Sequence, residues 1–140
     1  MTTAPKWLTV VGVIALLWNL MGVAAIGADI FMPDMMMAGL TSTQRELAAM
    51  TPRWAQVGSM IAVGMGTLGA IGLIMRRAWA VPVFILSLAG VIVQDVWLFA
   101  LSNTVDAYGN SIIAFQAGVM GIAILLIWLA RGARGRGWLE

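Results

Sequence analysis

The sequence predicts an all-α membrane protein, in which four antiparallel transmembrane helices form a bundle and a short amphipathic helix lies in the first outer loop. The first observation is composition: the 140 residues are 61% hydrophobic and only 10% charged, whereas a soluble domain is about 45–50% apolar and about 25% charged. The second is that four apolar runs reach the roughly 20 residues that a helix needs to cross a bilayer. The third is that the later runs are joined by short links, which favour antiparallel neighbours. We therefore expect residues 1–140 to form a single integral membrane domain surrounded by lipid.

Tryptophans mark the ends of the four predicted spans, as expected for indole rings at the level of the lipid headgroups. The spans are Trp7–Ala28, Ala55–Met75, Trp79–Leu101 and Ser111–Ala130, and the tryptophans at their ends are Trp7, Trp54, Trp79 and Trp128. Lys6 and the small residues after the first span also suit a signal peptide. That span is too long for a usual signal-peptide core and contains Asn19, so we expect it to be retained.

The loop formed by residues 29–54 is the one sizeable segment between spans. Residues Thr43–Glu46 match the capping-box pattern, and Pro52 is a helix breaker, so the sequence predicts a short amphipathic helix over Gln44–Met50. A second helical turn is expected over Pro33–Gly39, because proline is favoured in the first turn of a helix and glycine just after its end.

Two links and a tail complete the chain. The second and third spans are joined only by Arg76–Ala78, which forces an antiparallel hairpin. The third and fourth spans are joined by Ser102–Asn110, where Tyr108–Asn110 is typical of a turn. Residues 131–140 form a basic tail, interpreted as an orientation signal that touches anionic lipid, with a motif for a partner as the alternative.

The basic residues predict the orientation of the chain. Six of the eight lysines and arginines lie in the N-terminal segment, in the 76–78 link or in the tail: Lys6, Arg76, Arg77, Arg131, Arg134 and Arg136. Because cytoplasmic segments are enriched in lysine and arginine, both termini are expected in the cytoplasm, with residues 29–54 outside. The compact chain favours a bacterial inner (plasma) membrane.

Small residues repeat every fourth position in the second span, as a stripe made of Gly58, Ala62, Gly66 and Ala70. Such a stripe lets another helix approach closely. Packing within the bundle is one interpretation, and a subunit seam or a sliding face in a transporter is the other. Since four helices rarely enclose a pathway alone, transport would favour a homo-oligomer.

Asp95 is the only formally charged residue inside the predicted spans. Placing an ionised carboxylate in hydrocarbon costs on the order of 3 kcal/mol, so such residues usually face the bundle interior and have a partner. Other polar and aromatic residues fall in the same outer half of the spans, which predicts a polar pocket open outward. The candidate ligand-binding residues are Asp95, Asn19, Gln94, Gln116, Trp18, Trp97 and Ser59.

Three roles for Asp95 are compatible with the sequence. It can be structural, paired with Arg53 at the top of the second span or hydrogen-bonded to Asn19 or Gln116. It can belong to a site for a ligand or an ion. It can carry a proton that is coupled to transport.

Residue types that the chain lacks exclude much chemistry. It has no cysteine and no histidine, which removes disulfides, thiol chemistry, Cys/His metal sites and imidazole catalysis. Asp34-Met35-Met36-Met37 suggests soft copper ligands, but consecutive methionines on a helix point in different directions. The basic residues are scattered, so nucleic acid is not an expected partner. We expect no metal, no cofactor and no enzymatic activity.

Several short motifs resemble those of small bacterial four-helix inner-membrane proteins that are loosely described as sugar transporters. They are Leu17–Gly22, Pro52–Trp54, Arg76–Pro82, Ser87-Leu88 and Tyr108-Gly109. The resemblance implies a transporter. The prediction is that the protein binds or transports a small polar or cationic solute through the outward pocket around Asp95. The alternative is a non-transporting accessory or sensor subunit that binds another protein.

Overall fold

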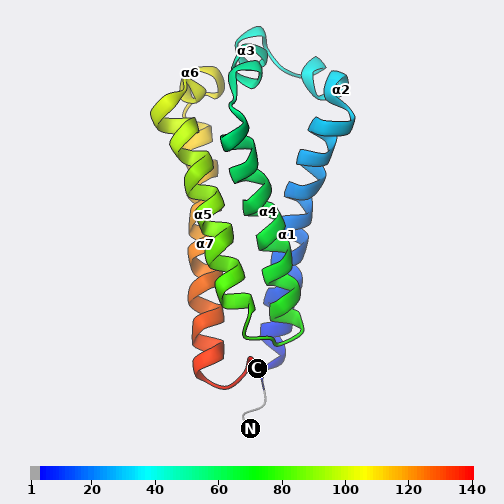
Figure 1. Ribbon diagram of the computed structural model, residues 1–140, viewed down its shortest axis with the longest axis vertical. Coiled ribbons are helices and arrows are strands. Elements are labelled where there is room, and N and C mark those ends of the chain that lie inside the picture. Colours follow the sequence, from blue (N-terminus) through cyan, green and yellow to red (C-terminus); the bar gives the residue numbers. More distant parts are fainter. Residues whose placement is uncertain (1–3) are drawn as a thin grey trace.

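The computed structural model describes residues 4–140, and its regular structure within that range is entirely helical (Figure 1). Four helices are long and apolar enough to cross a membrane, which confirms the predicted fold class and makes the chain a multi-pass membrane protein. They are α1 (Lys6–Phe31), α4 (Arg53–Ile74), α5 (Ala80–Asp95) continued by η1 (Val96–Leu101), and α7 (Ser111–Gly135). α1 ends three residues after the predicted first span, and α7 ends five residues after the predicted fourth span. A helix can continue beyond the part of it that faces hydrocarbon.

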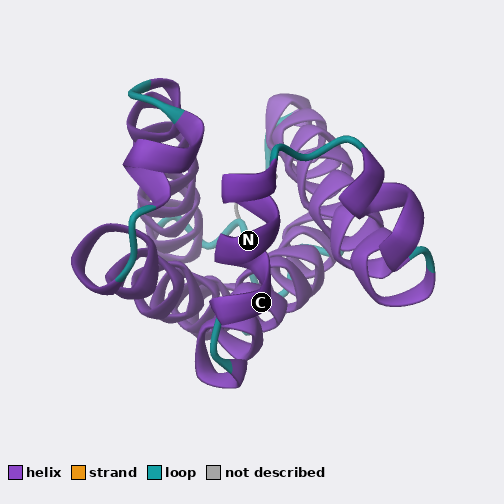
Figure 2. Cartoon of the chain, turned by 90° about the horizontal axis from the view of Figure 1, so that it is seen from above, coloured by secondary structure: helices purple, strands orange, loops and turns teal. Residues whose placement is uncertain are grey.

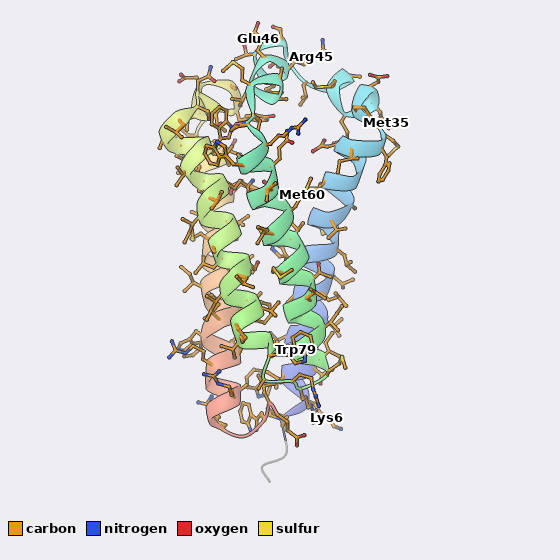
Figure 3. The ribbon with its side chains drawn as sticks, in the orientation of Figure 1. Lys6, Met35, Arg45, Glu46, Met60 and Trp79 are labelled. Atoms are coloured by element: carbon orange, nitrogen blue, oxygen red, sulfur yellow. The ribbon has the colours of Figure 1, made fainter. Side chains whose placement is uncertain are left out.

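The two ends of the bundle differ in what they carry. One end, the loop end, holds the short helices α2 (Pro33–Ala38), α3 (Ser42–Met50) and α6 (Thr104–Tyr108). The other, the terminal end, holds the start of α1 and the end of α7. Lys6 lies at the terminal end and Arg45 and Glu46 at the loop end (Figure 3). Charged groups thus stand beyond the apolar length of the helices, as a bilayer requires.

The closest packing in the bundle joins α4 to α5. At their crossing, a Cβ atom added to Gly90 would lie 2.5 Å from the Gly58 carbonyl oxygen and 2.6 Å from the Ala62 amide nitrogen. The predicted Arg76–Ala78 link does form an antiparallel hairpin, in which Arg76 takes a positive φ of 59°. The Arg77 amide then donates to the Gly72 carbonyl at 2.8 Å.

The small-residue stripe of α4 lies inside the chain. Gly58, Ala62, Gly66 and Ala70 are all buried. Gly58 faces Val93 and Gly90 of α5, whereas Gly66 faces the Asn19 side chain of α1. The stripe therefore packs α4 between two helices of its own chain. This burial is inconsistent with the subunit-seam interpretation, which needs the stripe on an outer surface.

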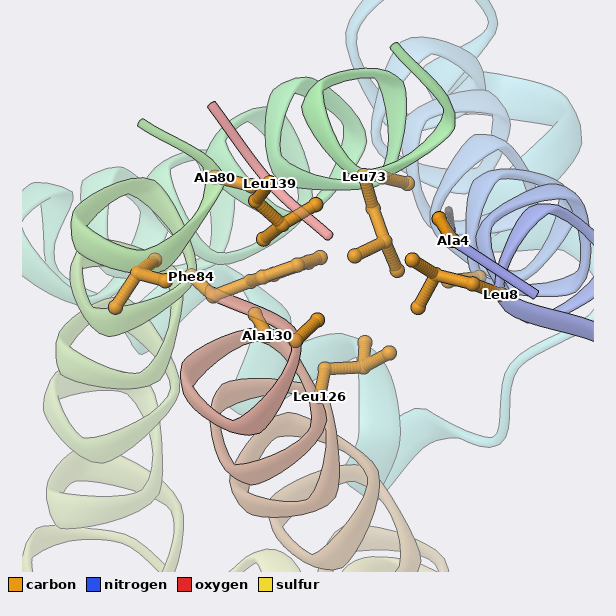
Figure 4. Packing of buried hydrophobic residues seen from close by; sticks show 12 residues of the cluster. Ala4, Leu8, Leu73, Ala80, Phe84, Leu126, Ala130 and Leu139 are labelled. Atoms are coloured by element: carbon orange, nitrogen blue, oxygen red, sulfur yellow. The ribbon is translucent and has the colours of Figure 1, made fainter. Parts of the chain in front are cut away.

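A hydrophobic cluster fills the terminal end (Figure 4). It joins Leu8 of α1, Leu73 of α4, Phe84 of α5, Leu126 of α7 and Leu139 of the final segment. The last residues of the predicted basic tail fold back over this cluster, whereas its arginines are exposed, and their contact with lipid stays a prediction. The Ala78 amide donates to the Glu140 carbonyl at 2.6 Å and the Glu140 amide donates to the Arg76 carbonyl at 2.9 Å.

The loop end contains the two short helical segments predicted between the first spans. The helix predicted over Gln44–Met50 is α3, and the turn predicted over Pro33–Gly39 is α2 with Gly39 as its C-cap. The predicted cap was wrong by two residues, since Thr41 and Gln44 form the capping box. Both Thr41 and Thr43 have Gln or Glu three residues later, so the pattern alone does not choose between them.

Side-chain hydrogen bonds tie the loop-end helices together. Gln44 Nε2 donates to the Ala107 carbonyl of α6 at 3.3 Å, and Arg45 Nε donates to the Met37 carbonyl of α2 at 2.8 Å. Gln44 both completes the capping box of α3 and bonds to α6. The helix start at Thr41 therefore fixes where α3 lies on the bundle.

We expect Thr41→Ala to weaken α3 by about 1 kcal/mol, the usual cost of losing a threonine N-cap. The measurement is hydrogen–deuterium exchange of the amides of residues 42–50, which should become faster. Thr43→Ala is the matched control and should leave exchange nearly unchanged. If Thr43→Ala accelerated exchange more than Thr41→Ala, Thr43 would be the N-cap, as predicted from the sequence.

Candidate functional site

A cavity of about 960 Å³ occupies the loop-end half of the bundle. This volume is at the upper end of the range found for small-molecule sites. All four long helices and the three short ones contribute to its walls. Figure 2 shows the arrangement of the helices from above, and Figure 1 shows α1 and α5 further apart at the loop end than at the terminal end. The protein is thus hollow at one end and packed at the other.

The floor of the cavity is the top of the hydrophobic cluster. Phe84 and Leu126 belong both to the cluster and to the cavity wall. Phe84 is 2% exposed, and its ring lies where a side chain on Gly69 would be. Because Gly69 has no side chain, the Phe84 ring can pack directly against the backbone of α4. This packing closes the cavity toward the terminal end.

The structure brings six of the seven predicted ligand-binding residues to the cavity wall. They are Trp18, Asn19, Ser59, Gln94, Trp97 and Gln116. They come from α1, α4, α5, η1 and α7, so the polar side chains in the loop-end halves of the spans do converge. Thr104 and Tyr108 of α6 also line the wall.

Asp95 does not line the cavity, so the prediction of a pocket around this residue needs correction. The cavity face of the third span contains Val91, Gln94 and Leu98. With 3.6 residues per turn, the position after Gln94 is rotated by about 100° and falls on the flank of that face. Asp95 Oδ1 is buried there and makes no hydrogen bond within residues 4–140.

No hydrogen bond joins Asp95 Oδ1 to its predicted partners in the described part of the chain. The Arg53 side chain is exposed. Asn19 Nδ2 donates to the Ala15 carbonyl of its own helix at 2.8 Å, and the Asn19 amide packs on Gly66. Gln116 Oε1 has no partner among the described residues. The structure thus does not support the pairing interpretation for Asp95 Oδ1.

Two cavity-lining residues present buried polar atoms without partners. Gln116 is only 7% exposed, and its Oε1 atom, an acceptor, makes no hydrogen bond within the described part of the chain. The same holds for Trp97 Nε1, a donor. Buried polar atoms are nearly always hydrogen-bonded in native proteins, and an unpartnered one costs about 1–3 kcal/mol. Both atoms have almost no accessible surface, so they are covered by neighbouring protein atoms and do not open onto the cavity as the side chains stand.

Two serines of the wall are already hydrogen-bonded by the protein. Ser59 Oγ donates to the Ala55 carbonyl at 3.3 Å, and Ser87 Oγ donates to the Ala62 carbonyl at 2.6 Å. Ser59 was predicted to bind a ligand, but its hydroxyl has this bond within its own helix. Ser87, which was not among the predicted ligand-binding residues, links α5 to α4. Gln94 and Tyr108 also line the wall, so their side chains supply hydrogen-bonding groups for a ligand.

Aromatic contacts frame the cavity on two sides. Trp97 packs edge-on against Trp54 with ring centroids 6.2 Å apart, which joins η1 to α4. Trp18 of α1 approaches Phe115 of α7 with centroids 6.5 Å apart. Phe115 was not among the predicted ligand-binding residues, because the sequence does not show that α1 and α7 face each other.

Charge is nearly absent from the wall. Asp29, near the loop end of α1, is the one charged residue among those that line the cavity. Met36 and Met37 lie on the wall near it, but no group of His, Cys, Asp or Glu within residues 4–140 could hold a metal ion. The site is therefore mainly apolar, with a small number of neutral hydrogen-bonding groups.

Comparison of the chain with models of known protein families, with curated proteins and with solved structures finds no match.

Proposed function

We propose that this membrane protein binds a small neutral molecule in the loop-end cavity and carries it across the membrane. The observation that supports binding best is the cavity of about 960 Å³, whose lining is mainly apolar and aromatic and includes the neutral polar residue Gln94. The Gln94 amide would donate to and accept from hydroxyl or amide groups on the ligand. Transport is the activity that the resemblance to small four-helix bacterial proteins implies.

A neutral ligand has more support than a cation. The cation hypothesis depended on a carboxylate in the pocket, and Asp95 is not on the wall. Asp29 is on the wall, but it stands at the outer end of α1, close to solvent. Trp18, Trp97 and Tyr108 supply flat apolar surfaces, which suit a ligand with an apolar face and a few hydroxyl or amide groups, a sugar ring included.

The proposed setting is a bacterial inner membrane with both termini in the cytoplasm and the cavity open outward. It rests on the distribution of lysine and arginine. Those in the N-terminal segment, the 76–78 link and the tail all belong to the terminal end, whereas only Arg45 and Arg53 belong to the loop end. A homo-oligomer is part of the proposal, through surfaces other than the buried stripe of α4.

Orientation can be measured with a reporter fused after Glu140. We expect activity from a reporter that works only in the cytoplasm and none from one that works only in the periplasm. A reporter inserted after Gly39, between α2 and α3, should behave in the opposite way. Periplasmic activity of the Glu140 fusion would invert the orientation and place the cavity on the cytoplasmic side.

Binding is tested by ligand-dependent thermal stabilisation of the purified protein against a panel of neutral polar solutes. A ligand that stabilises the wild type should lose at least about tenfold in affinity in Gln94→Leu, because this variant removes the amide that faces the cavity. Asp95→Asn, at the next position, is the matched control and should bind normally. Binding that persists in Gln94→Leu but disappears in Asp95→Asn would move the site to Asp95.

A further inference from the structure

Two buried oxygen atoms without hydrogen-bond partners belong to α5 and α7, which pack against each other. They are Asp95 Oδ1 and Gln116 Oε1, and each has almost no accessible surface, so each is covered by neighbouring protein atoms. A carboxylate oxygen and an amide oxygen are both acceptors, so they cannot bond to each other as they stand. Because buried polar atoms are nearly always hydrogen-bonded in native proteins, both oxygens need a donor.

The two side chains lie at about the same height in the bundle. Phe84 of α5 and Leu126 of α7 belong to one buried cluster, which fixes the register of these antiparallel helices (Figure 4). Asp95 lies eleven residues above Phe84, which is about 16 Å at 1.5 Å per residue. Gln116 lies ten residues above Leu126, which is about 15 Å.

The face of α5 that carries Asp95 is turned toward α7. Eleven residues make about three turns, so Asp95 falls on nearly the same face as Phe84. α4 packs on another face, where a Cβ atom added to Gly90 would meet the α4 backbone. Gly90 and Asp95 are about 140° apart around the helix. α7 is the other long helix that packs closely on α5 in the described part of the chain, so α7 is the neighbour that covers Asp95 Oδ1.

Gln116 lies on the side of α7 that is turned toward α5. The preceding residue, Phe115, approaches Trp18 of α1, and one position along a helix is a rotation of about 100°. The following residue, Ala117, is exposed, whereas Gln116 is only 7% exposed. The covered Gln116 side chain thus lies between the α1 side and the lipid side of α7, where α5 packs.

An ionised Asp95 has no cation beside it. On α4, the nearest basic residue is Arg53, whose side chain is exposed at the loop end, and on α7 the arginines Arg131 and Arg134 lie at the terminal end. Asp95 is only partly buried and does not line the cavity, so its remaining surface faces the bilayer. An ionised carboxylate in hydrocarbon costs on the order of 3 kcal/mol, and a buried carboxyl group without a charged partner becomes neutral instead.

We propose that Asp95 is a proton-binding site, in which the carboxyl group is held as a neutral acid between α5 and α7. A neutral carboxyl group has one O–H donor, so the proton lets Asp95 Oδ1 donate to Gln116 Oε1. One hydrogen bond then satisfies both oxygens. A divalent metal ion would not fit, because it needs about six oxygen ligands, and no group of His, Cys, Asp or Glu within residues 4–140 could hold one.

This inference goes beyond the proposed function and does not depend on the solute. Carboxyl groups that gain and lose a proton inside the membrane are used by pumps and transporters. If the protein transports, the proton is therefore the ion available for coupling. Gln116 belongs to the cavity wall as well as to the contact with α5. Loss of the proton would leave two acceptors facing each other, so the Gln116 amide would have to turn.

The first experiment treats the full chain in lipid discs with dicyclohexylcarbodiimide, a lipid-soluble reagent that reacts with neutral carboxylic acids and not with carboxylates. After reaction at neutral pH, modified residues are mapped by mass spectrometry. We expect an adduct on Asp95 and none on Asp34 or Asp106, which belong to the short helices of the loop end. Asp95→Asn should lose the adduct. This variant should fold, because the asparagine amide also donates to Gln116 Oε1.

Infrared spectroscopy of the same samples tests the hydrogen bond. A neutral acid has a carbonyl band separate from the bands of carboxylates, and we expect this band in the wild type and not in Asp95→Asn. Gln116→Leu should move the band to higher frequency, because the O–H group loses its acceptor. Gln94→Leu is the matched control. Gln94 lies on the cavity wall beside Asp95, and its loss should leave the band in place.

Three results would overturn the inference. If the wild type shows neither adduct nor band, Asp95 is ionised and the Gln116 amide is turned so that Nε2 donates to it. Equal labelling of Asp95, Asp34 and Asp106 would mean that reactivity follows exposure and not protonation. A band unmoved in Gln116→Leu would give the proton another acceptor. Solute-dependent stabilisation and its loss in Gln94→Leu are measured separately, so the proposed function and the proton site can each fail alone.

Discussion

Replacing Gly90 with alanine is expected to destabilise the protein by about 1–3 kcal/mol or more, the usual cost of forcing extra volume into a packed interface. The new Cβ atom would lie 2.5 Å from the Gly58 oxygen and 2.6 Å from the Ala62 nitrogen. Both are backbone atoms of α4, so no side chain can rotate away, and α4 and α5 must separate. Because this interface also orients the wall residues of α5, ligand binding should fall with stability.

The matched control for Gly90→Ala is Gly64→Ala on α4, where an added Cβ atom meets nothing within 4 Å. Alanine should be neutral or slightly stabilising there, because it has the higher helix propensity. The measurement is the free energy of unfolding in mixed micelles for both variants. Equal effects of the two substitutions would show that α4 and α5 do not cross at backbone contact distance.

Replacing Phe84 with alanine should have the largest effect on stability, about 3–5 kcal/mol by comparison with other buried phenylalanines. Phe84 is 2% exposed and is one of the largest fully buried side chains in the described part of the chain. Its ring separates the cavity from the cluster below (Figure 4). Without the ring, the cavity extends into the terminal end and its floor is lost.

Phe99→Ala is the control, because Phe99 belongs to the same span but is 41% exposed toward lipid. Its loss should cost far less, since a lipid chain replaces the contacts of the ring. Unfolding of both variants should be followed together with ligand-dependent stabilisation. Stability lost equally in Phe84→Ala and Phe99→Ala would contradict the assignment of Phe84 as the floor.

The spans and their antiparallel order could be predicted from the sequence because hydropathy and link length act locally. The convergence of Asn19, Gln94 and Gln116 could also be predicted, since polar side chains inside spans avoid lipid. These predictions need only the position of a residue along its own helix. They do not need the rotation of that helix about its axis.

That rotation explains the main error at the site. Asp95 and Gln94 are adjacent, and which of them faces the cavity depends on how α5 turns around its contact with α4. The contact is made by Gly58 and Gly90, and the pairing of these two glycines is not visible in either helix alone. The contact between Trp18 of α1 and Phe115 of α7 could not be predicted for the same reason, because it depends on which helices pack against which.

The most direct test of the central claim is an experimental structure of the full chain in a lipid disc, prepared from its own membrane. We expect non-protein density in the loop-end cavity, with a polar atom at about 3 Å from the Gln94 amide. A structure in which protein side chains fill the loop end, with the Gln94 amide bonded to another protein group and no room for a ligand, would contradict the claim.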